Sequence, residues 1–80
     1  MTIIDNVNLY KSSDLYLSAY LIVKGNQFTF EKNVKKISFI FTKTQNLDVN
    51  VNEYLMGKGS CEPLLYANAI KNLKNLLFNS

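Results

Sequence analysis

The chain has 80 residues, and 48% of them are hydrophobic, including five phenylalanines and five tyrosines. This length predicts one small domain, and this hydrophobicity excludes an intrinsically disordered protein. Nine lysines against six acidic residues give a net charge of +3, and one cysteine with no histidine excludes an internal disulfide and the usual zinc sites.

The first predicted elements are an N-terminal segment and a helix. Residues 1–11 alternate weakly between apolar and polar side chains, which predicts either a short strand or an extended arm. Short polar side chains at 12–14 can accept hydrogen bonds from the free amides of a first helical turn, and Gly25 suits the residue that follows a helix. We therefore expect a helix over 13–24. It is apolar almost all round, which predicts packing on more than one side or cover by another chain.

Two strands follow, over 27–31 and 36–42. Both segments alternate with a period of two, both are rich in residues that favour strands, and a short polar connection separates them. We interpret them as an antiparallel hairpin whose phenylalanines form an apolar layer for helices to cover. Because a hairpin alone is a poor sheet, we expect residues 1–11, the stretch 58–61 or a second copy of the protein to extend it.

Two helices complete the chain, over 45–56 and 63–78. In the first, apolar side chains recur at helical spacing, a threonine can cap its start and Gly57 can end it. In the second, Pro63 suits the first turn, and leucines form one stripe opposite lysines and asparagines. The predicted fold is therefore a single α+β domain with the order helix, strand, strand, helix, helix, in which helices cover an antiparallel hairpin.

The reactive side chains predict no enzyme and no cofactor. General acid–base catalysis usually requires histidine or paired carboxylates, whereas the six acidic residues are spread over different predicted elements. Cys61 has no histidine to act as its base, and we interpret it as a packed side chain. We also expect no metal site, because zinc sites need several cysteine or histidine ligands.

We expect neither a signal peptide nor a membrane-spanning segment. No basic start precedes an apolar run, and the longest apolar stretch, 19–23, is too short to cross a bilayer. A single cysteine is typical of a reducing compartment. We therefore expect a cytoplasmic protein without a membrane partner.

Lysines form the first candidate binding surface. Three cluster in and just after the predicted hairpin turn, and two lie on the polar face of the last helix: Lys32, Lys35, Lys36, Lys71 and Lys74. A lysine-tipped hairpin can lie against a phosphate backbone while nearby aromatic side chains stack on exposed bases. The alternative is that these lysines are solvated turn and edge residues that discourage aggregation.

The over-apolar first helix forms the second candidate surface. Its Tyr16, Tyr20 and Ile22 are candidates for contact with a protein partner. The same helix, together with the free edge of the predicted hairpin, makes a homodimer a reasonable expectation.

Several short motifs, in order, resemble a known family. They are YKSSDLYLSAYL at 10–21, KG at 24–25, ISFIF at 37–41, NEYLMG at 52–57, EPLLY at 62–66 and LKNLL at 73–77. Over about residues 9–78 the chain resembles the small uncharacterised domain-of-unknown-function (DUF) family 5659, although Glu62 stands where that family tends to have Asp. The family has no assigned activity or site residues, so the resemblance implies none. Its members are small stand-alone proteins of bacteria, archaea and viruses, which implies an accessory role in a phage or mobile element.

Two functional hypotheses follow. The first is a non-catalytic accessory protein that binds DNA or RNA through the lysine-rich hairpin, with steep salt dependence and little sequence specificity. The second is a protein-binding module, such as a phage-encoded, anti-CRISPR-like inhibitor of a host defence complex. We rank nucleic-acid binding first by a narrow margin.

Overall fold

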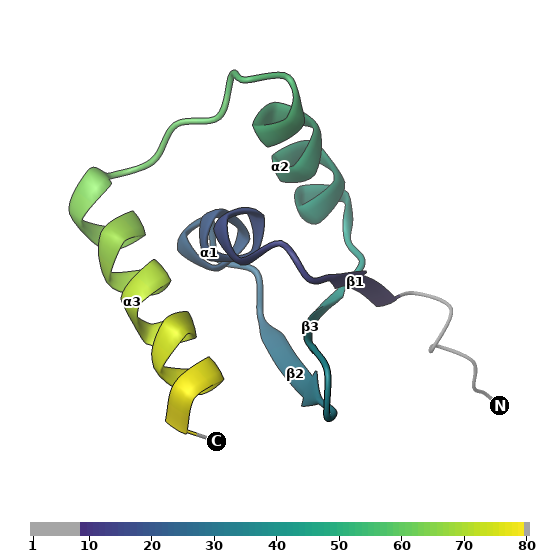
Figure 1. The fold of residues 1–80 in the computed structure, drawn as a ribbon. Helices are drawn as coiled ribbons and strands as arrows, with labels where there is room; N and C mark the ends of the chain where they lie inside the picture. Colours follow the sequence, from purple (N-terminus) through teal and green to yellow (C-terminus); the bar gives the residue numbers. More distant parts are fainter. Residues whose placement is uncertain (1–8, 80) are drawn as a thin grey trace, which may run out of the picture.

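The computed structural model describes residues 9–79, and Figure 1 shows their arrangement. The elements, in chain order, are β1 (Leu9–Ser12), α1 (Leu15–Val23), β2 (Phe28–Lys32), β3 (Ile37–Thr42), α2 (Gln45–Leu55) and α3 (Pro63–Asn79). The α+β class and the order helix, strand, strand, helix, helix are confirmed, with β1 in front of them. Most of the predicted N-terminal segment, residues 1–8, lies outside the described residues.

The central strand of the antiparallel sheet is β3. The strand order is β1-β3-β2, so the N-terminal segment extends the hairpin, whereas the stretch 58–61 forms no strand. The register places Tyr10 and Phe28 on either side of Phe41. Phe39 and Phe41 are fully buried, so this face of the sheet carries the core.

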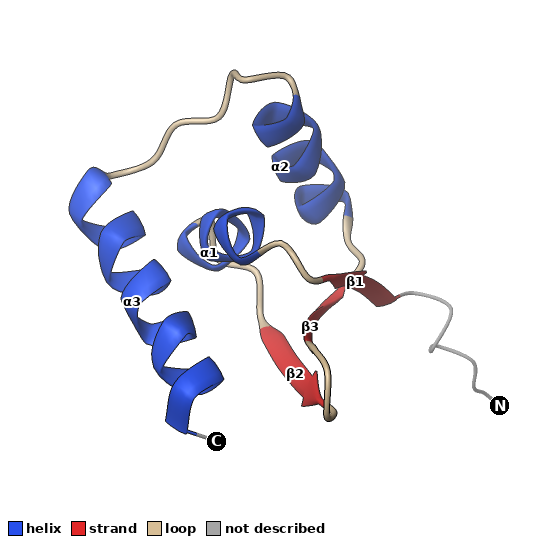
Figure 2. Ribbon diagram, in the orientation of Figure 1, coloured by secondary structure: helices blue, strands red, loops and turns tan. Residues whose placement is uncertain are grey.

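All three helices lie on this face of the sheet, with α1 between α2 and α3 (Figure 2). This position explains why α1 is apolar almost all round, because it contacts β1, α2 and α3. Its residues Leu17, Ala19 and Leu21 are all buried, although they do not share one side of a helix. Packing on several sides is therefore the reason for its composition.

Short-range interactions fix where the helices begin and end. The side chains of Asp14, Thr44 and Glu62 each accept a hydrogen bond of 3.0 Å from a backbone N–H in the first turn of the helix that follows. Gly25 and Gly57 follow α1 and α2 with φ angles of 97° and 73°, which residues with a side chain rarely adopt.

The opposite face of the sheet combines Leu9 and Ile40 with polar and charged side chains. There Lys11 Nζ lies 3.3 Å from Glu31 Oε1, so an ion pair spans β3 from one edge strand to the other. Both side chains are exposed, and such pairs contribute about 0–1 kcal/mol. The ion pair has a larger effect on the distribution of charge than on stability. It partly neutralises Glu31, which is the acidic residue closest in sequence to the hairpin lysines.

Candidate functional site

The hairpin turn presents two of the predicted lysines. Asn33 Oδ1 accepts hydrogen bonds from the backbone N–H groups of Lys35 and Lys36 at 3.0 and 3.1 Å, and the Asn33 N–H donates to the Lys36 carbonyl at 3.0 Å. Through these hydrogen bonds, the backbone N–H groups of the turn find their partners within the turn itself. The side chains of Lys35 and Lys36 are exposed beyond it.

A hydrogen bond from Lys32 joins the hairpin to α3. Lys32 Nζ donates to the Leu77 carbonyl at 3.2 Å, at the C-terminal turn where a cation stabilises the helix dipole. Lys74 is one turn before Leu77, and Lys71 is about one turn earlier still. Figure 1 shows the hairpin turn and the C-terminal end of α3 at the same end of the molecule. We call the five predicted lysines together, Lys32, Lys35, Lys36, Lys71 and Lys74, the lysine end.

Acidic side chains are concentrated elsewhere. Within residues 9–79, none of Lys35, Lys36, Lys71 and Lys74 forms an ion pair, and the nearby Glu31 is paired with Lys11. The other carboxylates of this range lie at the start of α1, on α2 and at the start of α3. The hydrogen bond from Lys32 to Leu77 is the contact that joins the hairpin to α3, the helix that carries Lys71 and Lys74.

An exposed aromatic ring lies beside Lys74. Phe78 is 81% exposed, and it lies four residues after Lys74, so the two side chains are neighbours on one face of α3. This exposure could be expected from the sequence, because Phe78 falls outside the leucine stripe of the helix.

The residues predicted to contact a protein partner, Tyr16, Tyr20 and Ile22, differ in their exposure. Tyr16 is exposed, and Ile22 is half-buried beside α3. Tyr20 is only 3% exposed, so the expectation that it contacts a partner is corrected here. Its ring is in the core because α1 is covered by α2 and by the loop that leads to α3, and its hydroxyl donates to Glu53 Oε1 at 3.3 Å.

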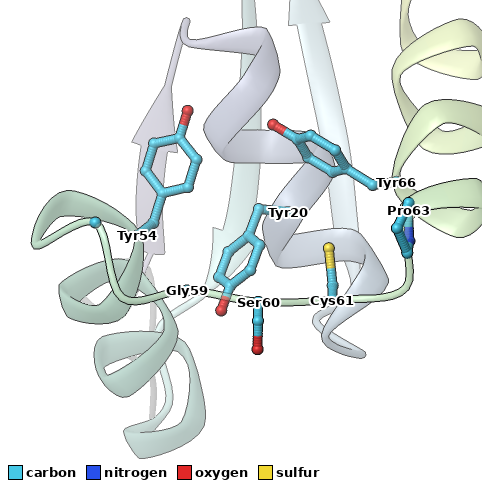
Figure 3. A pocket seen from close by; sticks show the side chains of 8 residues that line it. Tyr20, Tyr54, Gly59, Ser60, Cys61, Pro63 and Tyr66 are labelled. Carbon is cyan, nitrogen blue, oxygen red and sulfur yellow. The ribbon is translucent and has the colours of Figure 1, made fainter.

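Tyr20 instead forms one wall of a pocket that the sequence analysis missed. Figure 3 shows Tyr20, Tyr54 and Tyr66, one from each helix, around the loop between α2 and α3. The pocket has a volume of about 400 Å³, and Cys61 also lines it. The rings of Tyr20 and Tyr54 are 5.6 Å apart between centroids, at an angle of 41°.

Contacts with α1 hold this loop in place. Gly59 packs so closely on the Tyr20 ring that a Cβ at this position would lie 2.8 Å from the Tyr20 hydroxyl oxygen. Lys24 Nζ donates to the Ser60 carbonyl at 3.1 Å and lies 5.6 Å from the centre of the same ring. The loop glycine, which the sequence indicated only as part of a connection, therefore has a packing role.

Two phenols of the pocket, those of Tyr20 and Tyr66, are weaker acids than an ordinary tyrosine. Burial raises the pKa of Tyr20, and the negative charge of Glu53 raises it further. Burial also raises the pKa of Tyr66, whose hydroxyl donates to the Tyr16 carbonyl at 3.2 Å, and Tyr54 contributes to this rise. Both hydroxyls stay protonated at neutral pH and act as hydrogen-bond donors within the fold.

Within residues 9–79, no group of three or more cysteine, histidine or acidic side chains is placed to hold a metal ion. None of the helices in that range combines the length and apolar character needed to cross a membrane.

Comparison with known proteins places the chain in a family. A family model described as Domain of unknown function (DUF5659) matches residues 7–79. The chain belongs to the DUF5659 family. The match covers every helix and strand described above, so the DUF5659 family corresponds to the complete α+β arrangement. No curated protein and no solved structure matches the chain.

Proposed function

We propose that this DUF5659 protein is a non-catalytic accessory protein that binds single-stranded DNA or RNA through the lysine end. The main support is the hydrogen bond from Lys32 to Leu77, which brings the hairpin with its lysines against α3, the helix that carries Lys71 and Lys74. Four of these lysines have no ion-pair partner within residues 9–79, and the exposed ring of Phe78 lies beside them.

The side-chain chemistry defines the kind of nucleic acid. Lysine ammonium groups attract phosphates as point charges, whereas bidentate recognition of guanine edges needs the planar guanidinium of arginine, which the chain lacks. An aromatic ring such as that of Phe78 stacks on bases only when they are unpaired. We therefore expect little sequence specificity and a preference for single strands over duplexes.

Fluorescence anisotropy with labelled strands tests this function. Single-stranded and duplex DNA and RNA of matched sequence are titrated with the protein at several salt concentrations. If Lys35, Lys36, Lys71 and Lys74 each neutralise one phosphate, the log–log slope of affinity against salt on single strands should be about −3. Absence of binding to every strand at low salt would contradict the proposal.

Paired charge reversals locate the binding surface. Lys35→Glu/Lys36→Glu and Lys71→Glu/Lys74→Glu should each weaken single-strand binding by roughly tenfold or more, because each removes two phosphate contacts and adds repulsion. The matched control is Lys43→Glu/Lys58→Glu, which changes the net charge equally outside the lysine end. Lys32 is left intact, since it also donates to the last turn of α3. Equal losses in all three variants would mean that net charge alone drives binding.

Protein binding remains a second candidate function, and one observation favours it. An apolar groove lies beside the edge strand β2, and Ile22 of the predicted protein-binding surface lines it. The lysine end and this groove are separate surfaces, so the two functions can be tested independently.

A further inference from the structure

A groove with mostly apolar walls runs along one side of α3. Its volume is about 540 Å³. The end of α1 and Phe28 of β2 form one wall. Six side chains of α3, which recur at helical spacing, form the other: Leu65, Asn68, Ala69, Asn72, Leu73 and Leu76. None of the described residues that line the groove is charged.

The position of α3 leaves part of this surface exposed. Within residues 9–79, α1 is the helix that packs against α3, which lies at the edge of the helix layer (Figure 2). Leu65 is 54% exposed at the first turns of α3, whereas Leu73 is buried and forms the floor of the groove. An exposed apolar side chain and an apolar hollow therefore lie next to each other on one surface.

The spacing of the six α3 residues is the same in both directions along the helix. Counted from Leu65 or back from Leu76, successive members are three, one, three, one and three residues apart. When two such helices pack antiparallel about a two-fold axis, Leu65 of one lies opposite Leu76 of the other, and Ala69 lies opposite Asn72. At 1.5 Å per residue, the matched stripe is about 16 Å long.

We infer that this groove binds α3 of a second copy of the chain, in an antiparallel pair with two-fold symmetry. The inference rests on protein binding, the second candidate function, and names the partner; it does not depend on nucleic-acid binding. Leu65 of each copy enters the groove of the other beside Leu76 and Phe28. Its removal from water, twice in the dimer, is the main favourable contribution.

The centre of the pair contains side chains that can face their own copies. Ala69 is short, and the separation of two packed helices depends on the side chains at their contact, so the two backbones can approach closely there. Asn72 of both copies lies near the two-fold axis. Because a side-chain amide both donates and accepts hydrogen bonds, two identical amides can pair with each other.

The absence of charge in the groove favours a second copy over a foreign protein. Across a two-fold axis the same surface meets itself, so a charged lining would meet charge of its own sign. A foreign partner of opposite charge would instead favour a charged lining. Lys71 and Lys74 fall outside the stripe, on the other side of α3 at 3.6 residues per turn, so the net charge of +3 stays away from the contact.

The size of the contact predicts a weak, reversible dimer. A stable dimer buries roughly 800 Å² on each copy. A stripe about 16 Å long on a helix about 10 Å wide provides less than this. We therefore expect a monomer–dimer equilibrium in the micromolar range.

Sedimentation equilibrium of the full chain, from low micromolar to millimolar concentration, tests the inference. The average mass should rise from 9.2 kDa toward twice that value. Because the groove is uncharged, the dimer should persist at high salt, whereas binding of single strands through the lysine end should weaken steeply. A mass of 9.2 kDa at every concentration would leave the groove to a foreign partner and would overturn the inference, without bearing on nucleic-acid binding.

Two adjacent leucines of α3 provide a matched pair of variants. Leu65 lines the groove, whereas Leu64 is 65% exposed outside it. Leu65→Glu should weaken dimerisation by roughly tenfold or more, because it buries two carboxylates without partners, and Leu64→Glu should leave it within about twofold. Both carboxylates lie in the first turn of α3, where the helix dipole favours them, so both variants should fold and bind single strands. Equal effects on dimerisation would contradict the inference.

Cysteine cross-linking tests the antiparallel register. In a Cys61→Ser background, Leu65→Cys protein is mixed with Leu76→Cys protein and treated with a short bis-maleimide. Links between the two variants should exceed links between two Leu65→Cys chains, whose cysteines are about 16 Å apart along the pair. Leu64→Cys mixed with Leu76→Cys is the control and should link less. Links mainly between Leu65→Cys chains would overturn the inference.

Discussion

At the scale of single residues, Gly59 has the most specific packing requirement. A Cβ at this position would lie 2.8 Å from the Tyr20 hydroxyl oxygen and 2.9 Å from the ring carbon that bears it. The ring cannot easily move away, because it is buried and its hydroxyl donates to Glu53. We predict that Gly59→Ala lowers the free energy of unfolding by about 1–3 kcal/mol through overpacking, measured by urea denaturation.

Two further variants isolate the steric cause. Lys58→Ala removes an exposed side chain from the same loop and should change stability by less than about 0.5 kcal/mol. In a Tyr20→Phe background the closest contact is absent, so Gly59→Ala should cost less than it does in the wild type. If Gly59→Ala is as neutral as Lys58→Ala, the loop does not pack on Tyr20 as described.

At the scale of elements, two asparagines connect the end of α1 to α2. Asn26 Nδ2 donates to the Leu21 carbonyl at 2.9 Å and to Asn50 Oδ1 at 3.0 Å, and the Asn50 side chain is buried. We predict that Asn26→Ala lowers the free energy of unfolding by about 1–3 kcal/mol, because it leaves a buried amide oxygen without its donor. Thermal and urea unfolding measure the loss.

Asn46→Ala is the control for this prediction. Asn46 is exposed, and its amide donates to Asn26 Oδ1 at 3.4 Å, which is long for a hydrogen bond. Its removal should cost less than about 0.5 kcal/mol. Similar losses in the two variants would show that the link between α1 and α2 does not depend on the buried pair.

At the scale of the whole molecule, the pocket lined by Tyr20, Tyr54 and Tyr66, here called the tyrosine pocket, makes the free energy of unfolding fall at alkaline pH. Burial raises the pKa of both Tyr20 and Tyr66 above the ordinary value of 10.0. The unfolded chain ionises these phenols near that value while the folded chain keeps them neutral, so the folded state binds more protons there. The free energy of unfolding should therefore be constant up to about pH 9 and fall as the pH rises through 10.

Urea denaturation between pH 8 and about pH 11 measures this fall. Tyr66→Phe removes one ionisable group from the pocket and should make the alkaline fall shallower. Tyr16→Phe, at an exposed position, is the control and should leave the fall unchanged. If all three proteins lose stability in parallel, groups outside the pocket cause the alkaline dependence.

The helices and strands could be predicted from the sequence where interactions between residues close in sequence determine them. Alternation over 36–42 identified the central strand, and Asp14 with Gly25 marked the ends of α1. β1 was predicted only as one alternative, because its alternation is weak and its pairing with β3 is long-range. Local patterns cannot specify such pairings, since they depend on the complete fold.

The candidate site could also be predicted only where it depends on residues close in sequence. The hairpin lysines could be predicted as exposed turn residues, but the hydrogen bond of Lys32 could not, because its partner Leu77 is distant in sequence. Tyr20 was assigned to the surface because an all-round apolar helix does not reveal which side chains its neighbours cover. The tyrosine pocket and the groove beside β2 lie between elements, so no single segment of sequence predicts them.

The contact between α1 and α3 has a consequence for protein synthesis. α1 is the first helix to be made and α3 is the last, yet α3 covers one side of α1. While the ribosome is still translating α3, that side of α1 has no cover from its own chain. The core is therefore completed only after α3 has been made, and until then one apolar side of α1 is exposed to aggregation.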